Sequence, residues 1–321
     1  SAEGGSAEGV ASRRAAPPAM AAAQVISHIH GLHHDFANTQ AHSNWLQQFQ
    51  QAPEAWAVVH ELLAGSAEEI VQYFACHTLV TKLQAGHLPN GGSCCQELMR
   101  YLSKFWAGPA AVRRQLVVAL VDCALWRPPA EDDQWFTDCV QQLSGSADAL
   151  PCLLEFLAVI PDEAANRKVV VDAVRRQAFA TNMLRHTKTV LEALWKASQA
   201  GDACAVAARR AFAKWLALQH ASPALRAQKR SGGSGGGPFS AEIVRQGTLH
   251  EHPLVLQAAQ IIGEGISTAH LELCRACGDL LSEAHSLTNE TTPQARLLLV
   301  LVIQAVVAGS RQLLPMAQGN N

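Results

Sequence analysis

Five histidines near the start of the chain are the residues whose type and spacing best suit a metal site. They are His28, His30, His33, His34 and His42. His30 and His34 are four residues apart, so on a helix both rings lie on one face, a geometry that can hold Zn²⁺. The pattern contains no glutamate, and Asp35 falls on another side of that helix. Because a third ligand is missing, we expect incidental surface histidines and no metal site.

Two cysteine pairs could act in metal binding or in thiol redox chemistry. Cys274 and Cys277 form a single C-x-x-C pattern, and Cys94 and Cys95 are adjacent. A zinc site needs a second pair at ligand spacing, and a redox motif needs a βαβ context. Neither pattern accompanies these cysteines. We therefore expect all four to be structural thiols.

Motifs for catalysis or cofactor binding are weak throughout the chain. Gly263-Glu264-Gly265 lacks the third glycine and the preceding strand of a dinucleotide-binding loop. The P-loop sequence Gly-Lys-Ser/Thr does not occur, and no Ser/His/Asp arrangement stands out. The sequence therefore predicts a protein that is not an enzyme and holds no cofactor.

Composition and charge favour a protein-binding function. The chain has 321 residues, of which 49% are hydrophobic and only 6% aromatic, and its formal net charge is -2. Such a balance gives no reason to expect direct nucleic-acid binding. Nine scattered cysteines, an odd number, are typical of buried thiols in a reducing compartment. No apolar signal segment is seen, and the longest apolar run, 297–309, is too short to insert into a membrane. We expect a soluble intracellular protein.

Helical periodicity, broken by Gly and Pro, runs through most of the chain. Alanine and leucine, the strongest helix formers, dominate its apolar residues. Breaks at Gly65-Ser66, Gly108-Pro109 and Gly145-Ser146 separate one helix from the next. We predict helices over 20–34, 39–51, 54–64, 67–85, 92–107, 109–126, 131–144, 147–160, 167–198 (with a break left open), 203–220, 252–268, 269–286 and 292–314.

Helices paired at a spacing of about forty residues predict an all-α fold, a right-handed α-solenoid of HEAT-like helix-turn-helix repeats. The alternative is a compact helical bundle, whose single core would hardly enclose so many helices. We expect a disordered segment over 1–19, repeats over 20–220, a flexible Gly/Ser-rich linker over 221–251, and further repeats over 252–321, with their truncation left open.

The order of several short motifs resembles the importin-β superfamily of nuclear transport receptors. The first reads Ala41-His42-Ser43-Asn44-Trp45-Leu46, with Phe49 and Glu54-Ala55-Trp56 after it. Segments 71–79 and 115–125 continue the pattern. The fourth, Leu150-Pro151-Cys152-Leu153-Leu154-Glu155 with Pro161-Asp162-Glu163, is similar to the transportin-SR and importin-thirteen branch in particular. The resemblance covers about residues 20–220, the N-terminal part of such a receptor.

The resemblance implies a shuttling receptor of cytoplasm and nucleus. Its N-terminal repeats would bind the GTP-bound form of the small GTPase Ran, its apolar slots nucleoporin phenylalanine-glycine repeats, and its later repeats protein cargo such as Arg/Ser-rich splicing factors. The Ran-binding face would lie on the inner helices, opposite their buried sides. The residues we assign to this face are Glu69, Gln72 and His77 in helix 67–85 and Arg113 and Arg114 in helix 109–126, with Asp122 left open.

Two other functions remain open at this point. A helical-repeat scaffold or adaptor would have the same fold but no GTPase partner. A degenerate or truncated gene product without transport activity would explain the irregular stretch from Ala221 to Glu251. The dependence of Ran binding on its nucleotide separates the receptor from the scaffold.

Overall fold

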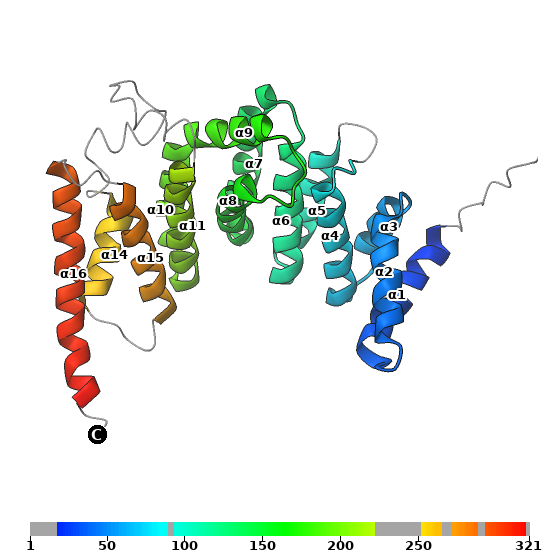
Figure 1. Cartoon of the computed structure of the whole chain (residues 1–321), viewed down its shortest axis with the longest axis horizontal. Coiled ribbons are helices and arrows are strands. Elements are labelled where there is room, and N and C mark those ends of the chain that lie inside the picture. The colour runs from blue at the N-terminus through cyan, green and yellow to red at the C-terminus, as the bar shows by residue number, and fades with distance from the viewer. Residues whose placement is uncertain (1–17, 89–92, 222–251, 265–270, 288–292, 319–321) are drawn as a thin grey trace, which may run out of the picture. The chain divides into compact units, whose positions relative to one another are not determined.

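The structure, a computed structural model, describes residues 18–88, 93–221, 252–264, 271–287 and 293–318 (Figure 1). Within these ranges the regular elements are α-helices and two short 3-10 turns, and there is no strand. The all-α fold class is therefore confirmed. The chain divides into two compact units, one ending at Leu79 and the other beginning at Val80.

The first unit is a small helical assembly. Its helices are α1 (Pro18–His34), α2 (Thr39–Gln51), α3 (Ala55–Gly65) and the first part of α4 (Glu69–Gln84). α1 packs against both α2 and α3. Val25, Ile29, Leu46 and Leu62 are almost completely buried because they fall on the facing sides of these helices.

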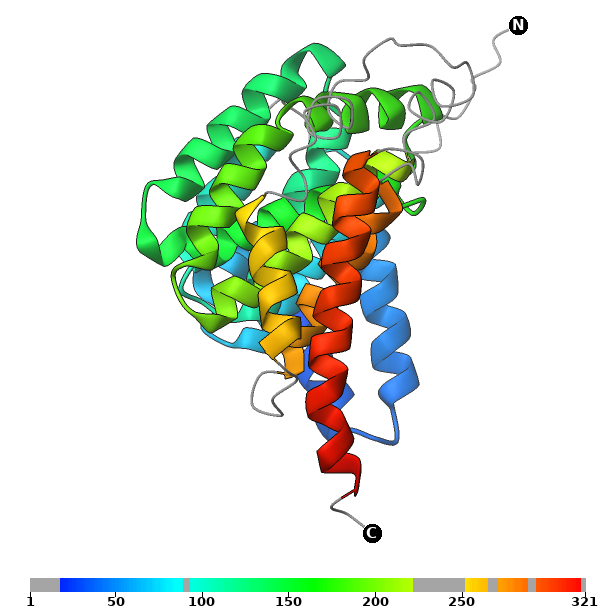
Figure 2. The same cartoon turned by 90° about the vertical axis from the view of Figure 1, so that its left-hand side faces the viewer.

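The second unit contains two rows of helices. They are α5 (Cys94–Phe105), α6 (Ala110–Leu125), α7 (Asp132–Ser144), α8 (Leu150–Ala165), α9 (Ala173–Arg185), α10 (Thr187–Ser198), α11 (Asp202–Ala221), α14 (Pro253–Glu264), α15 (Leu271–Leu287) and α16 (Pro293–Gln318). α6, α8, α11 and α15 pack on one another in sequence, and we call them the B row. α5 packs on α6, α10 on α11 and α14 on α15, so each pair is one repeat. Figure 2 shows the last helix, α16, alongside α14. This is the stacking of an α-solenoid of HEAT-like repeats.

Helix α8 continues past Pro161, where we predicted that it would end. A proline inside a helix leaves the carbonyl four residues earlier without its donor. That carbonyl belongs to Leu157, and the indole Nε1 of Trp215 in α11 donates to it at 2.6 Å. The tertiary contact supplies the missing hydrogen bond, so α8 reaches Ala165.

The predicted helix over 167–198 is two helices with an extended start. Residues 166–172 are not helical, and the Val170 amide donates to the Gln84 carbonyl at 2.9 Å. The Asp172 side chain accepts from the Arg175 amide and caps α9. His186 interrupts the helix between α9 and α10. The break that we had left open is therefore confirmed at His186.

The turn after α4 requires glycine. Gly86 has a φ of 81°, and a β-carbon on it would lie 3.0 Å from the Trp126 ring. The Trp126 Nε1 donates to the Leu83 carbonyl at 2.9 Å, near the end of α4. Trp126 thus fills the space that Gly86 leaves and fixes the end of α4 against the end of α6.

The remaining predictions concern helix ends, the linker, the cysteines and membrane spans. Most helix ends agree with the structure to within a few residues, although the predicted helix 252–268 ends at Glu264 in the described residues. The linker over 221–251 lies almost wholly outside the described residues, as does most of the segment 1–19. Eight of the nine cysteines are buried and Cys204 is half-buried. Among the described helices, none combines the length and the apolar character that a membrane span requires.

Candidate functional site

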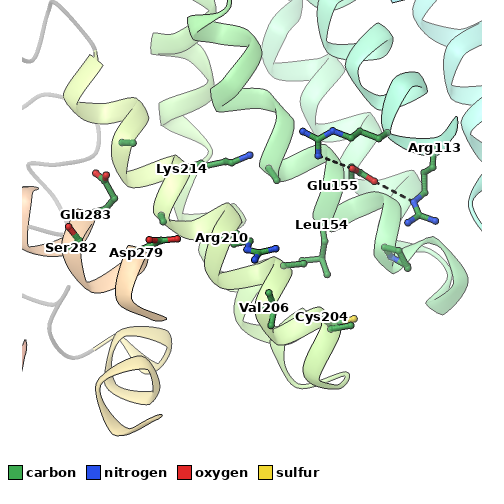
Figure 3. A pocket seen from close by; sticks show the side chains of 17 residues that line it. Arg113, Leu154, Glu155, Cys204, Val206, Arg210, Lys214, Asp279, Ser282 and Glu283 are labelled. Atoms are coloured by element: carbon green, nitrogen blue, oxygen red, sulfur yellow. Dashed lines mark hydrogen bonds and ion pairs between the residues drawn. The ribbon is translucent and has the colours of Figure 1, made fainter. Parts of the chain in front are cut away.

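A groove of about 730 Å³ runs along the B row of the second unit (Figure 3). Residues of α6, α8, α11 and α15 line it. Its floor consists of small and aliphatic side chains: Pro151, Leu154, Ala158, Ala203, Val206, Ala207, Ala213 and Ala217. Charged side chains stand around this floor. A shallow apolar floor with a charged rim is the anatomy of a protein-binding surface.

Two arginines of α6 meet one carboxylate of α8 at one end of the groove. Arg114 Nη1 lies 3.3 Å from Glu155 Oε1, and Arg113 Nε lies 3.5 Å from Oε2. Arg113 also donates to the carbonyls of Trp106 and Gly108, just beyond the end of α5. Its side chain is only 15% exposed, whereas that of Arg114 is 54% exposed. Arg113 therefore holds the structure together, and Arg114 is the arginine that a partner can reach.

The other end of the groove carries charges of both signs. Lys214 of α11 pairs with Asp162 at 2.6 Å, and Arg210 pairs with Glu272. Asp279 and Glu283 of α15 face the groove opposite them (Figure 3). The ion pairs of Arg210 and Lys214 are about half exposed, so a partner's carboxylates or cations can replace either member at small cost.

The three predicted residues of α4 belong to the first unit. Glu69 is exposed in the first turn, and His77 is exposed with its ring parallel to that of Tyr73, at 6.1 Å between centroids. Gln72 is only 8% exposed, and its Nε2 donates to the Ser66 carbonyl at 2.8 Å. The expectation that Gln72 lies on an accessible face was therefore wrong, because its amide closes the turn before α4.

Asp122, which we had left open for the same face, is completely buried. Its carboxyl lies against that of Glu163 in α8, and Gln84 Nε2 donates to its Oδ2 at 3.2 Å. Burial, and then the neighbouring Glu163 carboxyl, raise the pKa of Asp122 to about 9. Asp122 is thus protonated at neutral pH. It ties α6 to α8 and is out of a partner's reach.

The Asp122 carboxyl makes the stability of the fold depend on pH. A raised pKa means that the folded chain holds a proton that the unfolded chain releases above about pH 4, so stability falls as pH rises from about 4 to about 9. Asp122→Asn keeps the hydrogen bonds without this proton. We expect the variant to gain about 1–3 kcal/mol relative to the unmodified chain between pH 6 and pH 8, measured by urea unfolding. Asp148→Asn, at an exposed position, is the control, and parallel pH profiles for Asp122→Asn and the unmodified chain would contradict this account.

The histidines and the C-x-x-C pair do not form metal sites in the described residues. His30 Nε2 lies 2.7 Å from Glu68 Oε2, within hydrogen-bond distance of this carboxylate. The facing histidines are His28 and His42, with 2.9 Å between their Nδ1 atoms. Cys274 and Cys277 are buried in α15. Burial raises the pKa of the Cys277 thiol to about 11, as expected for a structural thiol.

Several groove residues were not singled out from the sequence. Arg210 and Lys214 are four residues apart on α11, and Asp279 and Glu283 are four residues apart on α15. This spacing puts each pair on one face of its helix and could have indicated a shared surface. Glu155 was part of the fourth motif, but its two arginine partners lie about forty residues earlier in the chain and could not be paired with it from spacing.

Comparisons with known proteins agree with the all-α repeat fold. The model of the Exportin 1-like protein family matches residues 109–220, which include α6, α8 and α11. The chain is also similar to Transportin MOS14 of Arabidopsis thaliana, with 31% identity over 205 residues, 60% of this chain. The matched region is 21% of the Arabidopsis protein, so the chain spans about a fifth of that relative's length. Together with the stacked HEAT-like helix pairs, these two matches support membership of the importin-β superfamily.

Proposed function

We propose that this chain is part of a nuclear transport receptor that binds Ran-GTP through the B-row groove. The observation that carries the proposal is that the groove's cations Arg113, Arg114, Arg210 and Lys214 all fall within the segment matched by the Exportin 1-like family. They stand on two helices of the B row, α6 and α11, and the carboxylates paired with Arg210 and Lys214 are exposed enough for a protein partner to displace. Charge complementarity of this kind steers association and sets partner choice.

The wider function that we propose is supported by the same comparisons. Such a receptor shuttles between cytoplasm and nucleus, contacts nucleoporin phenylalanine-glycine repeats, and carries protein cargo, for which Arg/Ser-rich splicing factors remain our candidate. The transportin-SR branch remains part of this proposal. Ran-GTP and cargo would oppose each other because each favours a different curvature of the stacked repeats. Glu69 and His77 stay candidates for Ran contacts on α4, whereas the buried Gln72 is no longer one.

Arg114→Glu tests the groove with little risk to the fold. The side chain is 54% exposed, so reversing its charge leaves the packing intact. We expect Ran-GTP affinity to fall roughly tenfold, with a steeper effect at low salt, measured by biolayer interferometry. The structural Arg113 is a poor choice for this test because it is largely buried.

Arg185→Glu is the matched control. Arg185 in α9 is 56% exposed and, like Arg114, has one carboxylate partner, Asp133, but it is absent from the groove. We expect its affinity for Ran-GTP to equal that of the unmodified chain. Equal losses in both variants would mean a general charge effect, and no loss in Arg114→Glu would place the Ran contacts elsewhere. The receptor function itself fails if the unmodified chain does not bind Ran-GTP, or if it binds the GTP and GDP forms equally well.

A further inference from the structure

A pair of buried thiols joins α5 to α6 at the start of the second unit. The Sγ atoms of Cys95 and Cys123 lie 3.2 Å apart, with the Cys95 thiol donating to Cys123. The two residues are 5% and 4% exposed. A disulfide bond has an S–S length of about 2.05 Å, so the sulfurs need to approach by only about 1.1 Å. Cys123 also has the Cys94 thiol as a hydrogen-bond partner, so a test of this pair must separate Cys95 from Cys94.

The surroundings distinguish the two sulfurs. The hydrogen bond with Cys123, and after it the Arg127 guanidinium, lower the pKa of Cys95. Arg127 is held in place by Glu131, 2.6 Å away and one turn on, and its side chain is 28% exposed. Hydrogen bonds with the thiols of Cys94 and Cys95, followed by burial, raise the pKa of Cys123. Cys95 is therefore the thiol that ionises first, and Arg127 marks the side from which a small molecule can approach.

We propose that Cys95 and Cys123 form a peroxide-reactive dithiol that closes to a disulfide between α5 and α6. The Cys95 thiolate attacks one oxygen of hydrogen peroxide, the O–O bond breaks, and Cys95 becomes a sulfenic acid while hydroxide leaves and takes up a proton as water. The Cys123 sulfur then attacks the Cys95 sulfur, the S–O bond breaks, and a second water leaves with the Cys123 proton. Two thiols are oxidised and one peroxide is reduced to two waters.

The disulfide would restrain the first helix pair of the second unit. α5 and α6 are the two helices of one repeat, and at present only packing and non-covalent contacts hold them together. A covalent bond restricts the unfolded chain and removes sliding between the helices. Because solenoids bend by small shifts between and within repeats, oxidation would stiffen this part of the stack. The inference is independent of the Ran proposal.

Peptide mapping of the whole chain after peroxide treatment tests the dithiol. After oxidation, remaining thiols are alkylated in denaturant, the chain is digested with trypsin and a Glu-specific protease, and cross-linked peptides are identified by mass spectrometry. We expect the Cys95–Cys123 cross-link at roughly tenfold higher yield than any other disulfide, with complete reversal by dithiothreitol. No such cross-link, at peroxide levels that oxidise free methionine added to the same sample, would overturn the proposal.

Single substitutions assign the roles of the sulfurs. Cys123→Ser should leave Cys95 as a sulfenic acid that dimedone traps, and Cys95→Ser should abolish the cross-link. Cys94→Ser should keep it, which separates Cys95 from its sequence neighbour. Cys152→Ser is the matched control, since this buried thiol of α8 has a pKa raised by burial to about 11, and it should leave the yield unchanged. A cross-link that survives in Cys95→Ser but disappears in Cys94→Ser would contradict the assignment.

Discussion

Asp132→Ala should destabilise the second unit by about 3–5 kcal/mol, because it leaves a buried arginine without its counter-charge. Arg175 of α9 donates to both carboxylate oxygens of Asp132, at 2.7 and 2.8 Å. The Asp132 side chain is completely buried and that of Arg175 is 10% exposed. Arg175 also donates to the Ala124 carbonyl at 2.7 Å, near the end of α6. The Asp132–Arg175 pair therefore connects α6, α7 and α9, and its loss weakens the packing of all three helices.

An exposed ion pair of the same chemistry provides the control. Arg210 and Glu272 pair across α11 and α15 with side chains that are 47% and 57% exposed. Glu272→Ala should change the free energy of unfolding by no more than about 1 kcal/mol, because water replaces the lost partner. Both variants are compared by urea unfolding followed by circular dichroism. If Asp132→Ala costs as little as Glu272→Ala, the buried pair does not hold the helices together.

Trp215→Phe should cost about 2–3 kcal/mol, since it deletes the only recorded donor that compensates for Pro161 within the described residues. Trp215 is completely buried, and the phenylalanine ring is smaller and has no N–H. The Leu157 carbonyl would remain buried without a hydrogen bond. The free energy of unfolding, measured with urea at fixed pH, should fall accordingly.

Pro161→Ala turns this prediction into a double-mutant cycle. An alanine at 161 has an amide that can donate to the Leu157 carbonyl within α8, so the indole is no longer needed for that hydrogen bond. Trp215→Phe should therefore cost about 1 kcal/mol less in the Pro161→Ala background than in the unmodified chain. Additive costs would show that the Trp215 contact and the Pro161 gap are independent.

Helix positions were largely predictable because their limits are set locally. Gly65-Ser66 and Gly145-Ser146 separate helices by backbone preferences that neighbouring residues do not change. The predicted helix end at Pro161 was wrong because the end of α8 is set by a distant residue instead of a local one. The donor that lets α8 continue past Pro161 is Trp215, which lies 58 residues after the Leu157 carbonyl that it bonds. No local pattern reports a hydrogen bond of that kind.

Burial of polar residues was the least predictable part of the candidate site. Helical periodicity indicated one buried face for α4 and one for α6. In the structure α4 is buried around most of its circumference. Its buried residues include Val71, Gln72, Ala75, Cys76 and Val80. A helix inside a stack of repeats has neighbours on more than one side, so the apolar stripe underestimates its burial. Asp122 and Arg113 were taken for surface charges for the same reason. Glu69, His77 and Arg114 are exposed, as the sequence predicted.

The central claim is that this chain is a transport receptor with a GTPase partner, and nucleotide-selective Ran binding tests it most directly. The unmodified chain, shown to be helical and folded, is immobilised and exposed to equal amounts of Ran loaded with GTP or with GDP. The account predicts retention of the GTP form at least about tenfold above the GDP form, a difference of about 1.4 kcal/mol in binding free energy. Equal retention of the two forms, or no retention of either by the folded chain, would contradict it and favour a helical-repeat scaffold without a GTPase partner.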